Sequence, residues 1–288
     1  VTLAAHCPKL VAPAMNPHML ENPIPQDNLK TLAHYGFTVI PSGSGMLACG
    51  DVGAGRLPEE GVLGDYVLRE LACQKDMRGK MVVVSAGATQ EAMDPVRYIT
   101  NHSTGKMGYA VARAGMLRGA DGTLLASTGC HLPAVPFVKT VPFTTAADLF
   151  EAVKENAMDA DALVMAAAVA DYRPAVVAAD KMKKKDGELF VALERTQDIL
   201  AWVGEHNPEK LFVCGFSMET KDLLQNSTAK LQKKKMDMIV ANNVKVAGAG
   251  FGVDTNVVTL ITKDTVEELP QQSKDDVAMR IVDKIVQS

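Results

Sequence analysis

The chain has 288 residues, of which 47% are hydrophobic and 22% are charged, and its formal net charge is -4. This composition is typical of a globular protein with one large or two moderate domains, and the negative charge argues against a nucleic-acid-binding protein. No apolar run approaches the roughly 20 residues that span a bilayer, so we expect no membrane segment.

The first 77 residues read as a segment of their own, with one predicted strand (residues 10–14) and one predicted helix (near residues 28–35) between Pro- and Gly-rich loops. The segment opens on "VTLAAHCPKLVAPAMN", which lacks an initiator Met and has no basic residues ahead of its apolar part. We therefore expect a fragment of a longer protein and no secretory signal peptide. The charged link "CQKDMRGK" leads out of this segment.

From residue 81 onward, strand and helix patterns alternate. The apolar run of residues 81–85 indicates a parallel strand that is buried on both faces. A helix follows from Met107 to Leu117, with Ser103 or Thr104 as its expected N-cap and Gly119 as its closing glycine. Further predicted strands lie at 123–126, 138–141, 162–168, 211–215, 238–241 and 257–261, and further helices at 146–156, 199–206, 223–235 and 275–286. This alternation predicts a doubly wound α/β sheet.

Several common chemistries are excluded by missing motifs. Gly105 and Lys106 are not followed by the Ser or Thr of a nucleotide-hydrolase phosphate loop, and no G-x-G-x-x-G follows residue 85. No Ser-His-Asp ordering or pair of acid–base carboxylates is recognisable. The five cysteines have no metal-ligand spacing and are expected to be reduced cytosolic thiols, mostly in the core: Cys7, Cys49, Cys73, Cys130 and Cys214.

Polar loops follow four of the predicted strands, at the edge where doubly wound sheets bind their ligands. Ser103, Thr104 and Gly105 precede a predicted helix, whose free N–H groups suit an anion, although an ordinary helix cap explains Ser103 as well. Asn101, just upstream, has an amide that can donate to an acyl or phosphoryl oxygen or serve a turn. Asp171 follows another strand and is a candidate for a nucleotide hydroxyl, a base edge or Mg²⁺, with a surface turn as the alternative.

Two clusters of lysines lie near these loops. A lysine run is usually a solvated face, and lysines near a helix C-terminus also favour the helix dipole. If both clusters converge on the sheet edge, they form a cradle for a polyphosphate. The clusters are Lys181, Lys183, Lys184 and Lys185, and Lys230, Lys233, Lys234 and Lys235. The residues alone thus indicate an α/β protein that binds a phosphorylated, anionic ligand.

Six motifs follow one another over about 210 residues: "SAGATQEAMDPVRYITNHSTGKMG", "AAAVADYRP", "DKMKKK", "DIL", "GFSMET" and "AKLQKKKMDMIVANNV". In sequence and in order, they resemble the motifs of the phosphopantothenate–cysteine ligase half of the bifunctional coenzyme A biosynthesis enzymes. The resemblance implies a Rossmann-like ligase domain at residues 78–288. Its expected reaction joins 4'-phosphopantothenate to L-cysteine through an acyl-cytidylate made from CTP.

Roles for individual residues follow from this resemblance by position. Lys181 matches the lysine that supports formation of the acyl-cytidylate. Asn101 matches the asparagine that is required to convert the acyl-cytidylate in the second step. Asn101 is also expected to contact the acyl substrate together with Ser103, Thr104 and Gly105. Nucleotide contacts are implied for Ala167, Ala168, Asp171, Lys181, Asp198, Ile199, Leu200, Phe216, Lys230 and Lys234. Metal ligands stay undefined.

The resemblance also implies cofactors and partners. Mg²⁺ and the lysines are expected to neutralise charge in both steps. The enzyme is expected in the cytoplasm, without nucleic-acid or membrane partners, as a homodimer of ligase domains. The segment "GELFVAL" (residues 187–193) fits a strand that reaches across the dimer.

The first segment resembles the end of the fused flavin-dependent phosphopantothenoylcysteine decarboxylase, through "APAMNPHM" and "GSGMLACGDVGAGRLPE". It implies an α/β remnant at residues 1–77, in which Asn16 contacts the substrate carboxylate and Cys49 is the proton donor. FMN, decarboxylation and a higher homo-oligomer are expected only of a complete decarboxylase domain.

Some positions depart from the ligase pattern, and alternatives stay open. Gln90 replaces the usual Arg, His102 and Thr104 vary the Asn-Arg-Ser-Ser-Gly motif, and Thr196-Gln197 replaces a residue followed by Pro. The choice between CTP and ATP is open. The alternative functions are an FMN-dependent decarboxylase and a non-catalytic nucleotide-binding fragment.

Overall fold

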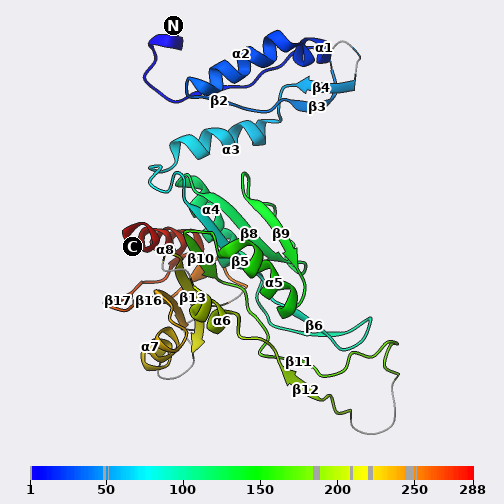
Figure 1. Ribbon diagram of the computed structural model, residues 1–288, viewed down its shortest axis with the longest axis vertical. Coiled ribbons are helices and arrows are strands. Elements are labelled where there is room, and N and C mark those ends of the chain that lie inside the picture. Colours follow the sequence, from blue (N-terminus) through cyan, green and yellow to red (C-terminus); the bar gives the residue numbers. More distant parts are fainter. Residues whose placement is uncertain are drawn as a thin grey trace. The chain divides into compact units, whose positions relative to one another are not determined.

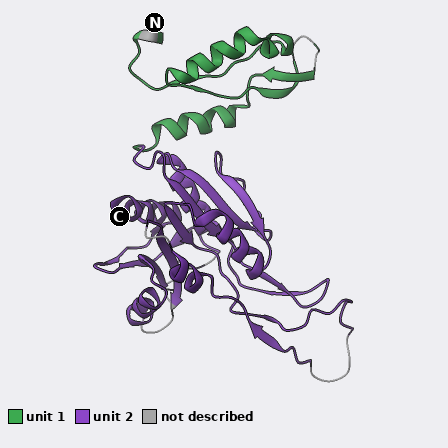
Figure 2. Cartoon of the chain, in the orientation of Figure 1, with its two compact units in different colours: residues 1–74 green, residues 75–288 purple. Residues whose placement is uncertain are grey.

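The computed structural model describes residues 2–47, 50, 52–183, 189–207, 210–219, 223–243, 250 and 252–288. The chain divides into two compact units, residues 1–74 and residues 75–288 (Figure 2). Among the described residues, no helix combines the length and the apolar character needed to cross a membrane.

Unit 1 (residues 1–74) combines short strands with helices and buries few side chains. Its strands pair in two small sheets, β1 with β2 in parallel and β3 with β4 antiparallel. Among its described residues, Ile40 is the only buried side chain apart from glycine and proline positions. The elements are η1 (Thr2–Ala4), β1 (Lys9–Val11), α1 (Pro17–Glu21), α2 (Pro23–His34), β2 (Phe37–Val39), β3 (Gly43–Met46), β4 (Val52–Arg56) and α3 (Glu60–Leu71).

Unit 2 (residues 75–288) is built, within its described part, on an eight-stranded sheet (Figure 1). The strand order is β17 (Val266–Glu268), β16 (Val258–Thr262), β14 (Met238–Asn243), β13 (Phe212–Glu219), β10 (Ala162–Met165), β5 (Met81–Ala86), β8 (Asp121–Ser127) and β9 (Lys139–Phe143). The six strands from β14 to β9 are parallel, whereas β16 pairs antiparallel with β14 on one side and with β17 on the other. The predicted α/β class is confirmed, and the antiparallel edge adds to the prediction.

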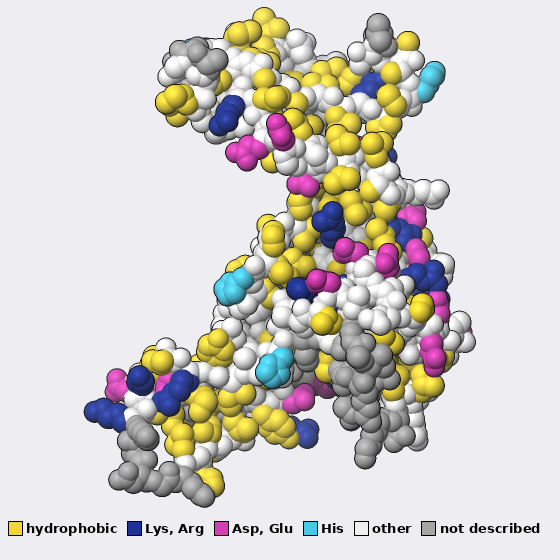
Figure 3. Space-filling model, turned by 180° about the vertical axis from the view of Figure 1, so that it is seen from behind, with side chains coloured by type: hydrophobic (Ala, Val, Ile, Leu, Met, Phe, Trp, Pro, Cys, Tyr) yellow, Lys and Arg dark blue, Asp and Glu magenta, His cyan; other side chains and the backbone are white. Residues whose placement is uncertain are grey.

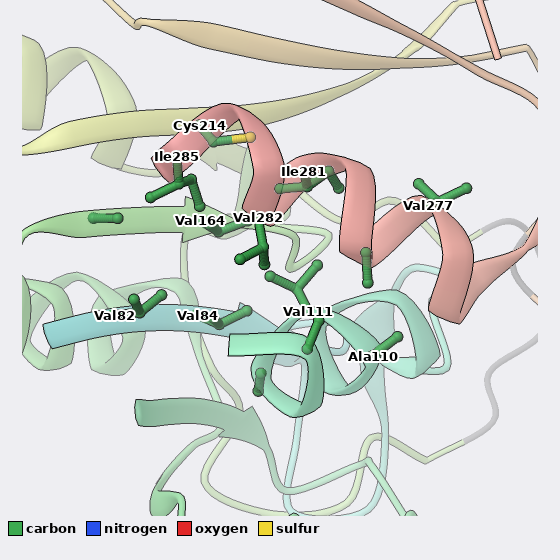
Figure 4. Close-up of a cluster of buried hydrophobic side chains, with 14 of the residues drawn as sticks. Val82, Val84, Ala110, Val111, Val164, Cys214, Val277, Ile281, Val282 and Ile285 are labelled. Atoms are coloured by element: carbon green, nitrogen blue, oxygen red, sulfur yellow. The ribbon is translucent and has the colours of Figure 1, made fainter. Parts of the chain in front are cut away.

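Helices cover both faces of this sheet, as a doubly wound fold requires. On one face α4 (Lys106–Leu117) and α8 (Lys274–Gln287) pack together over the central strands (Figure 4). There Val82 and Val84 of β5 meet Val111 of α4 and Val282 of α8 in one buried cluster. The other face carries α5 (Ala146–Ala157), α6 (Ile199–His206) and α7 (Leu223–Lys233). Burial on both faces explains why the central strands are continuous apolar runs.

The start of α4 differs from the prediction that Ser103 or Thr104 caps it. The N-cap is Gly105, in a left-handed conformation with φ of 83°, and no side chain caps the helix. Glycine reaches this conformation without strain, so the chain turns into the helix there. At the other end Gly119 closes the helix as predicted, with φ of 91° and its amide bound to the Met116 carbonyl at 3.0 Å.

Two strand ends also differ from the prediction. β10 stops at Met165, because the amide of Ala167 donates to the Ser85 hydroxyl (3.1 Å) beyond the end of the ladder. Ala167 and Ala168 were expected to lie in the strand end, but they follow it. In contrast, β13 continues past Gly215 to Glu219, because it stays paired with β14 over that whole length.

Two hairpins with their connecting residues extend from the sheet of unit 2, and we call them the arm (Figure 1). The arm comprises β6 (Gln90–Ala92) with β7 (Tyr98–Thr100), β11 (Tyr172–Pro174) with β12 (Leu193–Arg195), and the described residues between these strands. The strand expected at residues 187–193 is wrong for its described part, because β12 begins only at Leu193. A further two-stranded antiparallel sheet pairs β15 (Thr255–Asn256) with β18 (Gln272–Ser273).

The cysteines are less buried than expected. None of the four described cysteines is in a disulfide; only Cys214 is buried, while Cys7 is exposed and Cys73 and Cys130 are half-buried. Cys49 lies outside the described residues.

Candidate functional site

The loops that follow β5 and β10 are joined to each other beyond the sheet. The amide of Ala168 donates to the Gly87 carbonyl (2.8 Å), and the amide of Thr89 donates to the Ala168 carbonyl (3.2 Å). Because β5, β10, β13 and β14 are parallel neighbours, their carboxyl ends meet at one edge. The polar loops that the sequence placed after these strands therefore share one rim.

A cavity of about 840 Å³ opens at this rim. Its walls include all the predicted nucleotide-binding residues except Lys181: Ala167, Ala168, Asp171, Asp198, Ile199, Leu200, Phe216, Lys230 and Lys234. These residues come from segments up to 67 positions apart in the sequence, as between Ala167 and Lys234. The fold thus gathers them around one space, which we call the larger cavity.

The charge of the larger cavity favours an anion. Four basic side chains and two acidic ones line it: Arg195, Lys230, Lys233 and Lys234 against Asp171 and Asp198. Asp198 accepts the Ala201 amide (3.1 Å) as the N-cap of α6 and also pairs with the Lys234 ammonium (2.9 Å). This contact holds Lys234 of the α7 end against the start of α6. Lys233 belongs to the lysine cluster proposed as a polyphosphate cradle but was given no nucleotide contact of its own. Arg195 was missed, because it lies in no recognised motif.

A second, smaller cavity of about 150 Å³ shares the wall formed by Ala167, Ala168 and Phe216. Ser103, Thr104 and Gly105 line it, as does the first turn of α4. Free N–H groups at a helix N-terminus attract anions. Residues of the C-terminal part to which the sequence gave no individual role also line it, among them Asn242, Asn256 and Lys274. The side-chain oxygen of Asn242 is buried and has no hydrogen-bond partner among the described residues.

Asn101 lines neither cavity itself, but it contacts the wall that the two cavities share. Its side-chain amide donates to the carbonyl of Ala168 at 3.3 Å, and Ala168 lines both cavities. The neighbouring Thr100 hydroxyl donates to the Thr89 carbonyl (2.7 Å) and fixes the backbone of this loop. Asn101 itself is exposed, so a ligand at the shared wall can reach its amide.

Two lysines border the smaller cavity and bind the loop before β15. The Lys106 ammonium binds Asp254 (2.7 Å) and the Gly252 carbonyl (3.1 Å). The buried Lys274 ammonium donates to the carbonyls of Gly250 and Val253 (3.1 and 2.5 Å). Burial and the nearby Lys106 lower the pKa of Lys274, while Asp254 opposes the shift. Nothing in the sequence marked Lys274, which resembles a surface residue of a helix start.

Three predicted site residues lie elsewhere. Lys181 is exposed on the arm and lines neither cavity of its own chain. Asn16 belongs to unit 1, where its side-chain oxygen accepts the His18 amide (2.9 Å) and caps α1. Cys49 lies outside the described residues, so its predicted role is not placed.

Gly105→Ala is expected to destabilise unit 2 more than Gly119→Ala, its control. Both glycines have positive φ, where an Ala costs about 1–2 kcal/mol. A Cβ at Gly105 would also lie 2.6 Å from the Cys130 sulfur, whereas at Gly119 the nearest atom is a flexible Lys75 carbon at 3.4 Å. Overpacking adds about 1–3 kcal/mol. Urea unfolding followed by the fluorescence of Trp202, the single tryptophan, measures both. Equal losses in the two variants would contradict the predicted contact.

Comparisons with known proteins divide the chain at nearly the same place as the boundary between unit 1 and unit 2. A family model described as "DNA/pantothenate metabolism flavoprotein C-terminal domain" matches residues 77–288, and one described as "Flavoprotein" matches residues 1–72. The "Coenzyme A biosynthesis bifunctional protein CoaBC" of Bacillus subtilis is 43% identical over 98% of this chain and 70% of its own length. A "Cysteine/Cysteine sulfinic acid decarboxylase" from an unknown prokaryotic organism is 38% identical over 99% of this chain and 80% of its own.

A solved structure shares the fold of unit 2. It is the C-terminal domain of a coenzyme A biosynthesis bifunctional protein CoaBC, with a TM-score of 0.64 and 37% identity. The match covers 74% of this chain and 97% of that one.

Proposed function

Because the chain belongs to the family of bifunctional coenzyme A biosynthesis proteins, we propose that it joins 4'-phosphopantothenate to L-cysteine in a CTP-dependent reaction. We assign the reaction to the predicted ligase domain, residues 78–288, and place it in the cytoplasm. The products are 4'-phosphopantothenoylcysteine, CMP and pyrophosphate.

The reaction has two steps. A carboxylate oxygen of 4'-phosphopantothenate attacks the α-phosphorus of CTP, and the bond to pyrophosphate breaks. The amine of cysteine then attacks the acyl carbon of the acyl-cytidylate, loses a proton, and CMP leaves with the electrons of the broken acyl–oxygen bond. Both steps move negative charge, so fixed cations and N–H donors at the site lower the barrier.

The observation that carries the proposal is the larger cavity. It gathers the family's nucleotide positions from distant segments, and Lys230, Lys233 and Lys234 supply point charges for phosphate oxygens. The ammonium of Lys234 is already oriented by Asp198 at 2.9 Å. A polyphosphate is the ligand class that suits such a wall.

The acyl group is assigned to the wall between the cavities. There Asn101 can donate its amide to the acyl-cytidylate, with Ser103, Thr104 and Gly105 at the N-terminus of α4 on the side of the smaller cavity. Asn101 then stabilises the charge that develops when the amine of cysteine attacks.

Mg²⁺ fits this site only as an ion carried by the nucleotide. Among the described residues, no group of three or more His, Cys, Asp or Glu side chains could hold a metal. Mg²⁺ often binds substrate phosphates with one or two carboxylates and water, and Asp171 and Asp198 line the larger cavity. When bound, the ion would neutralise phosphate charge.

We assign Lys181 to the active site of a partner subunit in a homodimer. Apolar side chains gather on the arm that carries it (Figure 3), and Val176 and Phe190 are 81% and 85% exposed. Exposed apolar groups of this kind mark a contact surface. A second ligase domain covering the arm would bury them and bring Lys181 to the other chain's cavity.

A second candidate function belongs to the first unit. The Flavoprotein match over residues 1–72 and the decarboxylase named among the relatives support FMN-dependent decarboxylation by a complete domain. The described residues do not show the substrate contacts expected of this unit, because the side-chain oxygen of Asn16 caps α1 and Cys49 is not described. We therefore derive no step through FMN, and any higher oligomer is assigned to the complete domain.

Pyrophosphate release tests the proposed function directly. With 4'-phosphopantothenate and CTP, we expect about one pyrophosphate per site without cysteine and continuous release with cysteine. ATP and GTP run in parallel decide the nucleotide, and omission of 4'-phosphopantothenate is the control. Absence of acyl-dependent release with all three nucleotides would overturn the function, and faster release with ATP would overturn the choice of CTP.

A further inference from the structure

Asp94 closes the turn of the β6–β7 hairpin from a fully buried position. Its side chain is 0% exposed, and Oδ1 accepts the amides of Val96 and Arg97, both at 2.8 Å. Its Oδ2 accepts both Nε (3.0 Å) and Nη2 (2.6 Å) of Arg97. Charge-assisted hydrogen bonds of this kind are short and strong.

The same ion pair also binds a residue 88 positions away. Asp94 Oδ2 accepts the amide of Met182 at 3.0 Å, and Arg97 Nη2 donates to the Met182 carbonyl at 2.7 Å. Both polar groups of the Met182 backbone are therefore held. A third contact, from the Ala178 amide to the Met93 carbonyl (3.0 Å), fixes the same segment four residues earlier.

A turn cap does not explain these bonds. The turn is complete with the amides of Val96 and Arg97, and the two bonds to Met182 add nothing to it. Their effect is to fix the backbone next to Lys181, whose side chain is exposed. Arg97 and the backbone amides lower the pKa of Asp94, so the carboxylate stays charged at neutral pH.

We propose that Asp94 is a positioning residue for Lys181: with Arg97 it clamps Met182 and so sets where the lysine ammonium points. This rests on the proposed function, in which Lys181 supports formation of the acyl-cytidylate. A flexible lysine loses less entropy on reaching the nucleotide when its backbone is already fixed, and a displacement of about 1 Å can change a rate about 100-fold.

Asp94→Asn tests the clamp, and Asp180→Asn is its matched control. Asp180 is exposed and adjacent to Lys181, so its variant removes the same charge near the lysine without touching the clamp. Hydrogen exchange of the peptide containing Met182 should speed up in Asp94→Asn and not in Asp180→Asn. Unchanged exchange in Asp94→Asn would overturn the clamp, whatever reaction the protein catalyses.

The positioning role is read from the first half-reaction. We expect Asp94→Asn to slow the pyrophosphate burst about 10- to 100-fold with an unchanged dissociation constant for CTP. In the Lys181→Gln background, Asp94→Asn should cause no further loss, which a general structural defect would not reproduce. A normal burst despite faster exchange, or a further loss in the double variant, would overturn the positioning role. If the wild-type protein shows no acyl-dependent burst, the proposed function fails and this role of Asp94 fails with it, while the exchange result still decides the clamp.

Discussion

Asn101→Asp should release one pyrophosphate per site and then stop, with the acyl-cytidylate trapped and product formation reduced about 100-fold or more. The asparagine amide donates to the Ala168 carbonyl at 3.3 Å, at the wall shared by the two cavities. A carboxylate has no N–H to donate, and its charge opposes the charge that builds up when cysteine attacks. Rapid quench with separation of the nucleotide species measures the trapped intermediate.

His102→Asn is the matched control, because His102 is exposed and adjacent in sequence, whereas Asn101 makes the bond to the Ala168 carbonyl. It should turn over at close to the wild-type rate. Normal turnover by Asn101→Asp, or loss of the first burst together with turnover, would contradict the role assigned to Asn101.

Lys181→Gln should slow the first half-reaction about 100-fold, because a positive charge near the reacting phosphate is lost. The measurement is the rate of the pyrophosphate burst in the absence of cysteine. Lys183→Gln, two residues away and also exposed, removes the same charge and should leave the burst unchanged. Equal slowing in the two variants would show that only the overall positive charge matters, and would contradict a specific role for Lys181.

Mixing the Asn101→Asp and Lys181→Gln proteins decides which subunit supplies the lysine. If Lys181 acts in the site of its partner subunit, each mixed dimer contains one site with both residues intact. Subunit exchange should then restore roughly a quarter of the wild-type activity. If Lys181 acts within its own chain, no site regains both residues. An inactive mixture that contains mixed dimers would contradict the assignment to the partner subunit.

The central strands and helices could be predicted because their information is local. The apolar run at residues 81–85 became β5, and the helix expected at 199–206 is α6, with Asp198 as its cap. The predicted rim also formed, because parallel strands place their carboxyl ends on one side. The predicted strand end was wrong where a contact with a distant residue sets it: the amide of Ala167 binds Ser85, and β10 ends before this residue.

The sequence by itself determined the α/β class, the periodic elements and the ordered motifs that identified the family, since apolar spacing and short motifs depend on near neighbours. Only the tertiary structure decided that Gly105 starts α4, that Asn101 contacts Ala168, and that Asp94 holds Met182. Each of these contacts depends on the order of strands in the sheet or on a steric fit between distant segments. No local pattern encodes such pairings, because they are set by the packing of the whole unit.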